Sequence, residues 1–379
     1  MSTAAPAISH QPSVQPSAPQ DSLPVIDLAE LGDSAHHTPA HARLARIARD
    51  IGFFYLEGHG IDSAQIERME AITRQFFALP PEAKQRIAMR NSRHFRGYTG
   101  VGGEITRLRP DLREQIDFGE ELPPIQQAPE TPAWWGLQGP NQWPEELPAL
   151  QGEILAWLET TRTVAKHLLQ AFLVALEQPA TALDALVAAP HNNRLKIIHY
   201  PGQVQAQSDQ GVGAHKDGGL LTLLLQDEVG GLQVQTAHGW LDVPPRKNAF
   251  VVNIGEMLEL ATNGYLRANV HRVVSPRSGA SRYSIAYFFS PSLQAREVPL
   301  LDLPSQLARQ ARGPESDPLN PLFSHIGINA LKGRVRSHLD VAEVLSRTVR
   351  PAQCQGPKRL LRHRVNAGMA AARHSSPCL

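Results

Sequence analysis

The sequence has only two cysteines among its 379 residues, Cys354 and Cys378, and both lie near its C-terminal end. Residues 1–353 therefore offer no thiolate for a disulfide framework, a zinc–cysteine site or an iron–sulfur cluster. A body without cysteine is typical of proteins in the reducing cytoplasm, where disulfides are rare. We therefore expect a cytoplasmic protein.

The chain also lacks a run of about 18 apolar residues, so we expect no segment of it to span a bilayer. Its 37 Lys and Arg nearly balance 36 Asp and Glu, and a net charge of +1 gives no field that would attract nucleic acid or an acidic membrane. We therefore expect no nucleic-acid partner and no membrane, and we also expect a monomer or a weak oligomer.

The two ends of the chain differ in composition from its body. Residues 1–21 are rich in Pro, Ser, Ala and Gln, and lack the basic start and apolar run of a signal peptide. We predict a disordered leader there. Residues 346–379 contain seven Lys and Arg but no Asp or Glu, which predicts a basic, disordered tail.

Between these ends, spacing predicts a helical and strand-containing region over residues 22–190. Its clearest element is one long helix from Pro148 to about Leu176, with apolar residues at helical intervals. From residue 191 the pattern changes to short strands punctuated by Gly, Pro and Asn, which predicts an antiparallel double-sheet jelly roll over residues 191–300. C-terminal helices are expected over 301–345. The predicted fold class is mainly β with flanking helices.

The most informative pattern is a His-x-Asp pair with a distant histidine. His215 and Asp217 lie in Gly213–Gly219, and 53 residues separate Asp217 from His271. Two imidazoles and one carboxylate are the ligand set of a three-atom face on Fe(II), which leaves open positions for a co-substrate and O2. Simpler interpretations remain: His215 as a surface strand residue, Asp217 as the start of a turn into Gly218, and His271 as a core histidine.

A second pattern follows 11 residues after His271. Arg282 and Ser284 are two residues apart, so on a strand their side chains point to the same face. A guanidinium and a hydroxyl placed in this way can hold a carboxylate. The alternative is that Arg282 is a surface partner for one of the many acidic side chains.

Several stretches together resemble the isopenicillin N synthase-like family of non-haem iron oxygenases, most of which use 2-oxoglutarate. The resemblance covers roughly residues 23–344, and its features look more like bacterial than plant members of the family. The matching stretches are His215–Asp227, Gly230–Val234, Val252–Met257, Thr262–Gly264, His271–Val274, Arg282–Ser284, Gly52–Phe54, Gly58–Gly60 and Phe95–Tyr98.

The resemblance implies a distorted double-stranded β-helix with iron at its open mouth and a long helix behind it. It implies that His215, Asp217 and His271 are the iron ligands, and that Arg282 and Ser284 bind the distal carboxylate of 2-oxoglutarate. Tyr200 matches a tyrosine that often helps hold this carboxylate. The match is weaker there, because Ile198 replaces the Asn found two residues earlier in plant members.

The expected activity is that of an Fe(II)- and 2-oxoglutarate-dependent dioxygenase. It would couple the oxidative decarboxylation of 2-oxoglutarate by O2, giving succinate and CO2, to hydroxylation, desaturation or cyclisation of a small molecule. Candidate substrate residues are Phe95, Arg96, Tyr98 and Phe288, and no catalytic residue is predicted beyond the metal ligands. The alternatives are an Fe(II) oxidase of the same fold that does not use 2-oxoglutarate, and a non-catalytic jelly-roll module that binds a metal or a small acid.

Overall fold

Two facing sheets form the centre of the molecule. The structure is a computed structural model. It describes residues 22–32, 36–202, 208–276, 279–315, 317 and 320–348. The strands are β1 (Val25–Asp27), β2 (Phe53–Glu57), β3 (Gly97–Thr99), β4 (Ile105–Thr106), β5 (Arg109–Pro110), β6 (Glu114–Gly119), β7 (Arg194–Tyr200), β8 (Gln210–His215), β9 (Leu221–Gln226), β10 (Leu232–Thr236), β11 (Gly239–Val243), β12 (Phe250–Ile254), β13 (His271–Val274) and β14 (Arg282–Phe289).

The helices surround these sheets. They are α1 (Pro39–Asp50), α2 (Ser63–Phe77), α3 (Pro81–Arg86), α4 (Ala149–Ala175), α5 (Glu256–Ala261), α6 (Ser305–Ala308), α7 (Ile326–Ser337) and α8 (Leu339–Thr348), with 3-10 turns η1 (Leu28–Leu31), η2 (Met89–Asn91), η3 (Ala133–Leu137) and η4 (Asp184–Val187). The predicted leader and residues 349–379 of the predicted tail lie outside the described residues.

The larger sheet has the strand order β1-β2-β12-β9-β14-β7-β6-β3, and the smaller one has β11-β10-β13-β8. Apart from the parallel pair of β1 and β2, neighbouring strands of both sheets run antiparallel. A core of short antiparallel strands in two sheets, with helices around it, confirms the predicted fold class, a jelly roll with flanking helices.

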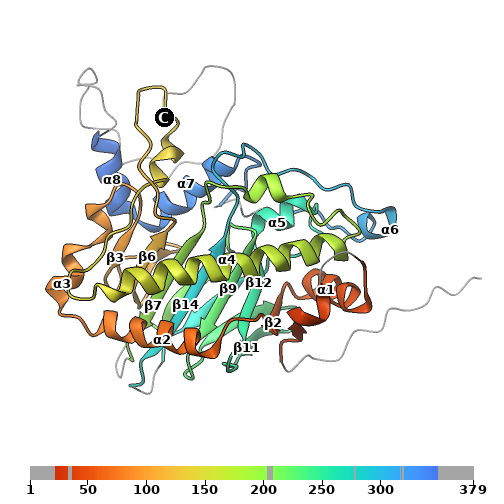
Figure 1. Cartoon of the computed structure of the whole chain (residues 1–379), viewed down its shortest axis with the longest axis horizontal. Helices are drawn as coiled ribbons and strands as arrows, with labels where there is room; N and C mark the ends of the chain where they lie inside the picture. Colours follow the sequence, from red (N-terminus) through yellow and green to blue (C-terminus); the bar gives the residue numbers. More distant parts are fainter. Residues whose placement is uncertain are drawn as a thin grey trace, which may run out of the picture.

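The long helix α4 crosses the outer face of the larger sheet, flanked by α1 and α2 (Figure 1). Its apolar side chains join those of β9, β12 and β14 in the main core, where Trp157 and Phe172 are fully buried. A second, smaller core lies between the two sheets and contains Phe53, Tyr200 and Val234. Among the described residues, no helix combines the length and apolar character needed to cross a membrane.

Strand alternation therefore divides the larger sheet into two chemically different faces. The outer face packs on α4, whereas the inner face looks toward the smaller sheet. Residues directly opposite one another on neighbouring strands share a face, so the register decides which side chains meet. On β14, Arg282 lies opposite Tyr200 and Phe288 lies opposite Arg194, and all four side chains belong to the inner face.

Candidate metal and co-substrate site

The two sheets bring His215, Asp217 and His271 together at one end of the space between them. His215 ends β8 and lies opposite His271, the first residue of β13. One potential ligand atom from each of the three side chains lies within 4.8 Å of the others. Nε2 of His215 is 3.4 Å from Oδ1 of Asp217, and Nε2 of His271 is 3.8 Å from the same oxygen. A single divalent ion could therefore contact all three.

The orientation of both imidazoles is set by the backbone. Nδ1 of His215 lies 2.8 Å from the carbonyl oxygen of Gly213, and Nδ1 of His271 lies 3.3 Å from that of Asn269. A proton on each Nδ1 would donate to these carbonyls, which leaves the lone pair of each Nε2 free to bind a metal. The arrangement thus presents two neutral nitrogen donors and one carboxylate oxygen, the donor chemistry that Fe(II) accepts.

Asp217 is held by two neighbours that were not predicted from the sequence. The hydroxyl of Thr222 donates to Oδ2 at 2.6 Å and Nδ2 of Asn253 donates to the same oxygen at 2.8 Å, so Oδ1 is left facing the histidines. Both residues lie on the inner face, on β9 and β12, opposite each other in the register. Strand alternation alone would have identified them as inward-pointing polar residues.

Asp217 and His271 are buried and His215 is half-buried, and this burial changes the proton affinities of the site. Burial alone would raise the pKa of Asp217, but the two histidines and the bond from Thr222 outweigh it and hold this pKa well below its usual range. Burial, followed by the proximity of His215, lowers the pKa of His271 to about 4. At neutral pH the structure therefore favours an ionised carboxylate and a neutral His271, the forms that bind metal.

Arg282 lies fully buried on the same inner face and forms no ion pair with an acidic side chain among the described residues. Its guanidinium donates to Oε1 of Gln226 at 2.8 Å and to the hydroxyl of Ser284 at 3.4 Å, and it stacks 4.7 Å from the ring centroid of Tyr200. Its Nε has no hydrogen-bond partner. A buried, permanently charged group with only neutral neighbours suits a carboxylate brought by a ligand.

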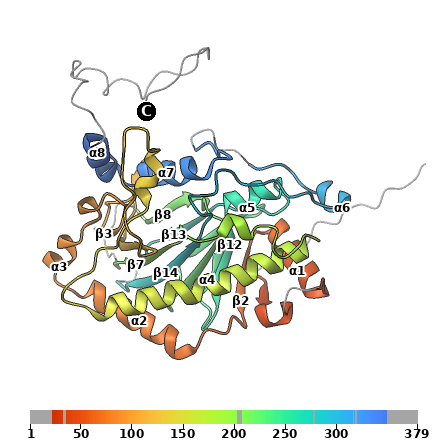
Figure 2. The same cartoon turned by 45° about the horizontal axis from the view of Figure 1, so that its top comes forward.

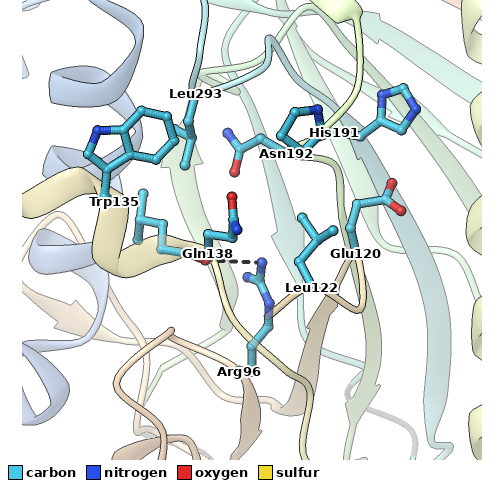
Figure 3. A pocket seen from close by; sticks show the side chains of 10 residues that line it. Arg96, Glu120, Leu122, Trp135, Gln138, His191, Asn192 and Leu293 are labelled. Carbon is cyan, nitrogen blue, oxygen red and sulfur yellow. Dashed lines mark hydrogen bonds between the residues drawn. The ribbon is translucent and has the colours of Figure 1, made fainter. Parts of the chain in front are cut away.

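The four candidate substrate residues do not lie together. Phe288 is half-buried on the inner face, in one row with Thr222. Arg96 is buried and reaches into a hollow lined by Trp135, Gln138 and Asn192, where it donates to the carbonyl oxygen of Leu137 at 3.3 Å (Figure 3).

The remaining two candidates are built into packed structure. Phe95 is fully buried in a small core with Leu137 and Leu293. Tyr98 lies on the outer face, where it packs against Phe76 and its hydroxyl donates to Glu114 at 2.6 Å. The motif Phe95–Tyr98 thus contributes only Arg96 to a hollow, because successive side chains point in different directions.

Comparisons with known proteins agree with this geometry. Residues 191–291 match the profile described as the 2OG-Fe(II) oxygenase superfamily, and residues 23–146 match the N-terminal region described as that of a non-haem dioxygenase in morphine synthesis. The sequence is 33% identical over 341 residues to the 2-oxoglutarate-dependent dioxygenase frbJ of a Dothideomycetidae species, covering 85% of this chain and 91% of that protein.

The chain is also similar to a plant enzyme in sequence and to a fungal protein in structure. A homoarginine-6-hydroxylase of Arabidopsis thaliana is 33% identical over 294 residues, covering 74% of this chain and 87% of the plant protein. The crystal structure of a full-length Neurospora crassa protein in complex with alpha-KG superimposes with a TM-score of 0.68 at 25% identity, covering 84% of this chain and 98% of the fungal one.

Proposed function

Because the chain belongs to the 2-oxoglutarate- and Fe(II)-dependent oxygenase superfamily, we propose that His215, Asp217 and His271 are its iron ligands. The protein is a 2-oxoglutarate-dependent Fe(II) dioxygenase that acts on a small molecule. The observation that carries the ligand assignment is the convergence of two imidazoles and one carboxylate within 4.8 Å. We further propose that Arg282, with Ser284 and Tyr200, holds the distal carboxylate of 2-oxoglutarate.

When bound, Fe(II) supplies the activation of O2 that couples conversion of 2-oxoglutarate into succinate and CO2 to insertion of the second oxygen atom into a substrate C–H bond. The residues of the chain position the reactants. Thr222 and Asn253 fix the Asp217 carboxylate, and the carbonyls of Gly213 and Asn269 orient the two imidazoles. Arg282 supplies a charged fork that orients the co-substrate from its far end.

The lack of cysteine in residues 1–353 supports a cytoplasmic enzyme, and the near-balanced charge supports one without nucleic-acid or membrane partners. We further propose a monomer or a weak oligomer. The proposed substrate residues are Arg96, which lines a hollow, and Phe288, on the inner face, whereas Phe95 and Tyr98 occupy packed positions.

Removal of the proposed co-substrate anchor should raise the 2-oxoglutarate requirement. We expect Arg282→Ala to increase the KM for 2-oxoglutarate by about tenfold to a hundredfold, because a charged hydrogen-bonded pair contributes roughly 1.5–3 kcal/mol. The measurement is succinate release against 2-oxoglutarate concentration. Arg246→Ala, at an exposed arginine that pairs with Glu57, is the matched control. An unchanged KM would remove Arg282 from this role, and substrate oxidation without succinate would indicate the direct oxidase instead.

Loss of a support for Asp217 should weaken metal binding without removing a ligand. We expect Thr222→Val to lower Fe(II) affinity by about tenfold to a hundredfold, because the valine keeps the shape of the side chain but cannot donate to Oδ2 of Asp217. Anaerobic titration of the apoprotein with Fe(II) measures this change. Thr236→Val, at the end of β10 and away from the metal site, should bind iron like the parent protein, and equal affinities for all three proteins would contradict the positioning role of Thr222.

A further inference from the structure

A cationic side chain that the proposed chemistry does not use lies on the inner face beyond the metal site. Arg194, the first residue of β7, is opposite Phe288 of β14, and Phe288 is opposite Thr222 of β9. Thr222 donates to Asp217, so this row runs from the proposed metal ligand to Arg194. Two strand spacings separate Arg194 from Thr222, roughly 10 Å between their Cα atoms.

The carboxylates near Arg194 are already engaged by other cations. Glu104 lies 2.8 Å from Arg113 and 2.9 Å from Lys196, and Asp117 lies 2.7 Å from Arg334. Asp111, the third buried carboxylate of this cluster, lies 3.3 Å from Arg113 and also accepts from Gln210 and from the backbone of Gly213. None of the three is within ion-pair distance of Arg194.

The side chain of Arg194 makes no hydrogen bond or ion pair with any other described residue, although it is half-buried. Burial, followed by the positive charges of Arg334 and Arg96, lowers its pKa well below the usual range. A guanidinium withdrawn from water without an anion is energetically unfavourable. Part of the surface of Arg194 stays accessible to solvent, from which an anion can approach it.

A second unpaired guanidinium is held beside it. Gly119 of β6 is the cross-strand neighbour of Arg194, and the guanidinium of Arg96 covers Gly119 so closely that a Cβ there would come within 2.2 Å of it. Arg96 has only the carbonyl of Leu137 as a partner, and its Nε is unsatisfied. Figure 3 shows the side chain of Arg96 among the residues that line the hollow. Neither guanidinium has a described carboxylate within ion-pair distance. Glu120, which lines the hollow with Arg96, is bound by Asn193 and Arg162, so the two adjacent guanidiniums form a site of positive potential.

This site is separate from the one assigned to 2-oxoglutarate. Arg194 and Tyr200 are the two ends of β7, and Tyr200 lies opposite Arg282. Six residues along a strand correspond to roughly 20 Å between Cα atoms, so Arg194 lies well apart from the arginine assigned to 2-oxoglutarate. Arg194 therefore lies in the same row as Thr222, six residues along the sheet from Arg282, so Arg194 and Arg282 are separate cationic positions.

We propose that Arg194 binds a carboxylate of the primary substrate, so that the enzyme oxidises small carboxylic acids. The inference rests on the proposed function, since it assumes that the row from Thr222 to Arg194 is the substrate side of the iron site. Arg96 adds positive potential next to Arg194, and Phe288, between Arg194 and Thr222, contacts the carbon skeleton. The anchored carboxylate then places a C–H bond of the same molecule toward the metal ligands.

The test uses the full chain loaded anaerobically with Fe(II) and 2-oxoglutarate, so that Arg282 is occupied. The probes are phenylacetate and hexanoate, each compared with its uncharged amide, and inorganic phosphate. Binding is read from the change in the visible band of the iron–2-oxoglutarate chelate and from the melting temperature. We expect the parent protein to bind each acid at least about tenfold more tightly than its amide, as a charge-assisted bond requires.

The variants identify the residue responsible. Arg194→Gln should abolish the preference for acid over amide, Arg194→Lys should retain part of it, and Arg246→Gln should leave it unchanged. Equal binding of acids and amides, no binding of any probe, or a preference that survives in Arg194→Gln would overturn the proposal, as would binding of phosphate alone. Failure of the chelate band to form would instead contradict the proposed function, before any acid is added.

Discussion

His271→Ala is expected to reduce iron-dependent turnover by at least about a thousandfold, because loss of one of three protein ligands removes roughly 4 kcal/mol or more of metal-dependent stabilisation of the transition state. The same result is expected for His215→Ala and Asp217→Ala. Each variant leaves only two of the three atoms that converge within 4.8 Å. Succinate release with excess Fe(II) and 2-oxoglutarate, together with the anaerobic chelate band, measures the loss.

His238→Ala provides the control, since His238 is exposed in the turn between β10 and β11 and lies outside the triad. Circular dichroism of each purified variant should show that the fold is retained. His271→Ala should disturb the fold less than Asp217→Ala, because Asp217→Ala would also leave the donors of Thr222 and Asn253 without their shared acceptor. Full turnover by a folded triad variant would refute the ligand assignment.

Two pairs of site residues could be predicted from the sequence because the members of each pair lie close together in the chain. His215 and Asp217 are two residues apart, Arg282 and Ser284 are two residues apart, and strand alternation makes each pair share a face. The structure has short strands in the region 191–300 where the sequence predicts them, and His271–Val274 is one of them. The mainly β class followed from the same alternation and turn residues.

What could not be predicted was the contact between segments far apart in the chain. Gln226 bonds to Arg282 because β9 pairs with β14 in one register, and a shift by one residue would turn it to the outer face. The sequence predicts both Tyr98 and Arg96 as substrate residues. The pairing of β3 with β6, however, directs the Tyr98 side chain to the outer face beside Glu114. The local sequence around Arg194 does not reveal that its side chain lacks a partner, so the sequence does not predict a role for it.

The same long-range pairing explains how the C-terminal helices are held at this end of the sheet. Figure 2 shows α7 and α8 beside the ends of β3 and β8. Arg334 of α7 reaches into the inner face and donates to Oδ1 of Asp117 at 2.7 Å, although 217 positions separate them in the chain. Asp117 is fully buried on β6 and also accepts from Gln115 at 2.9 Å. The helix over the proposed substrate side is thus attached through a buried ion pair.

Breaking the ion pair between Asp117 and Arg334 should lower the free energy of unfolding. We expect Asp117→Asn to destabilise the protein by about 3–5 kcal/mol, because removal of one partner leaves a buried charge uncompensated. Lys196, 3.7 Å from Asp117, would lose a neighbouring anion in the same step. Urea denaturation followed by circular dichroism measures the change. Asp242→Asn, at an exposed position on β11 that bonds to Gln233, should change stability little.

A double variant distinguishes a charge effect from a packing effect. With Asp117 neutralised, the cluster around Arg194 carries five cationic side chains (Arg96, Arg113, Arg194, Lys196 and Arg334) against Glu104 and Asp111. Arg194→Gln removes one of these like charges without breaking a hydrogen bond to any described residue. If unbalanced charge is the cause, Arg194→Gln should restore part of the stability lost in Asp117→Asn, and the two changes should not be additive. Additive losses would mean that Asp117 acts through local hydrogen bonding alone, and that the positive charge of Arg194 is already neutralised in the free protein.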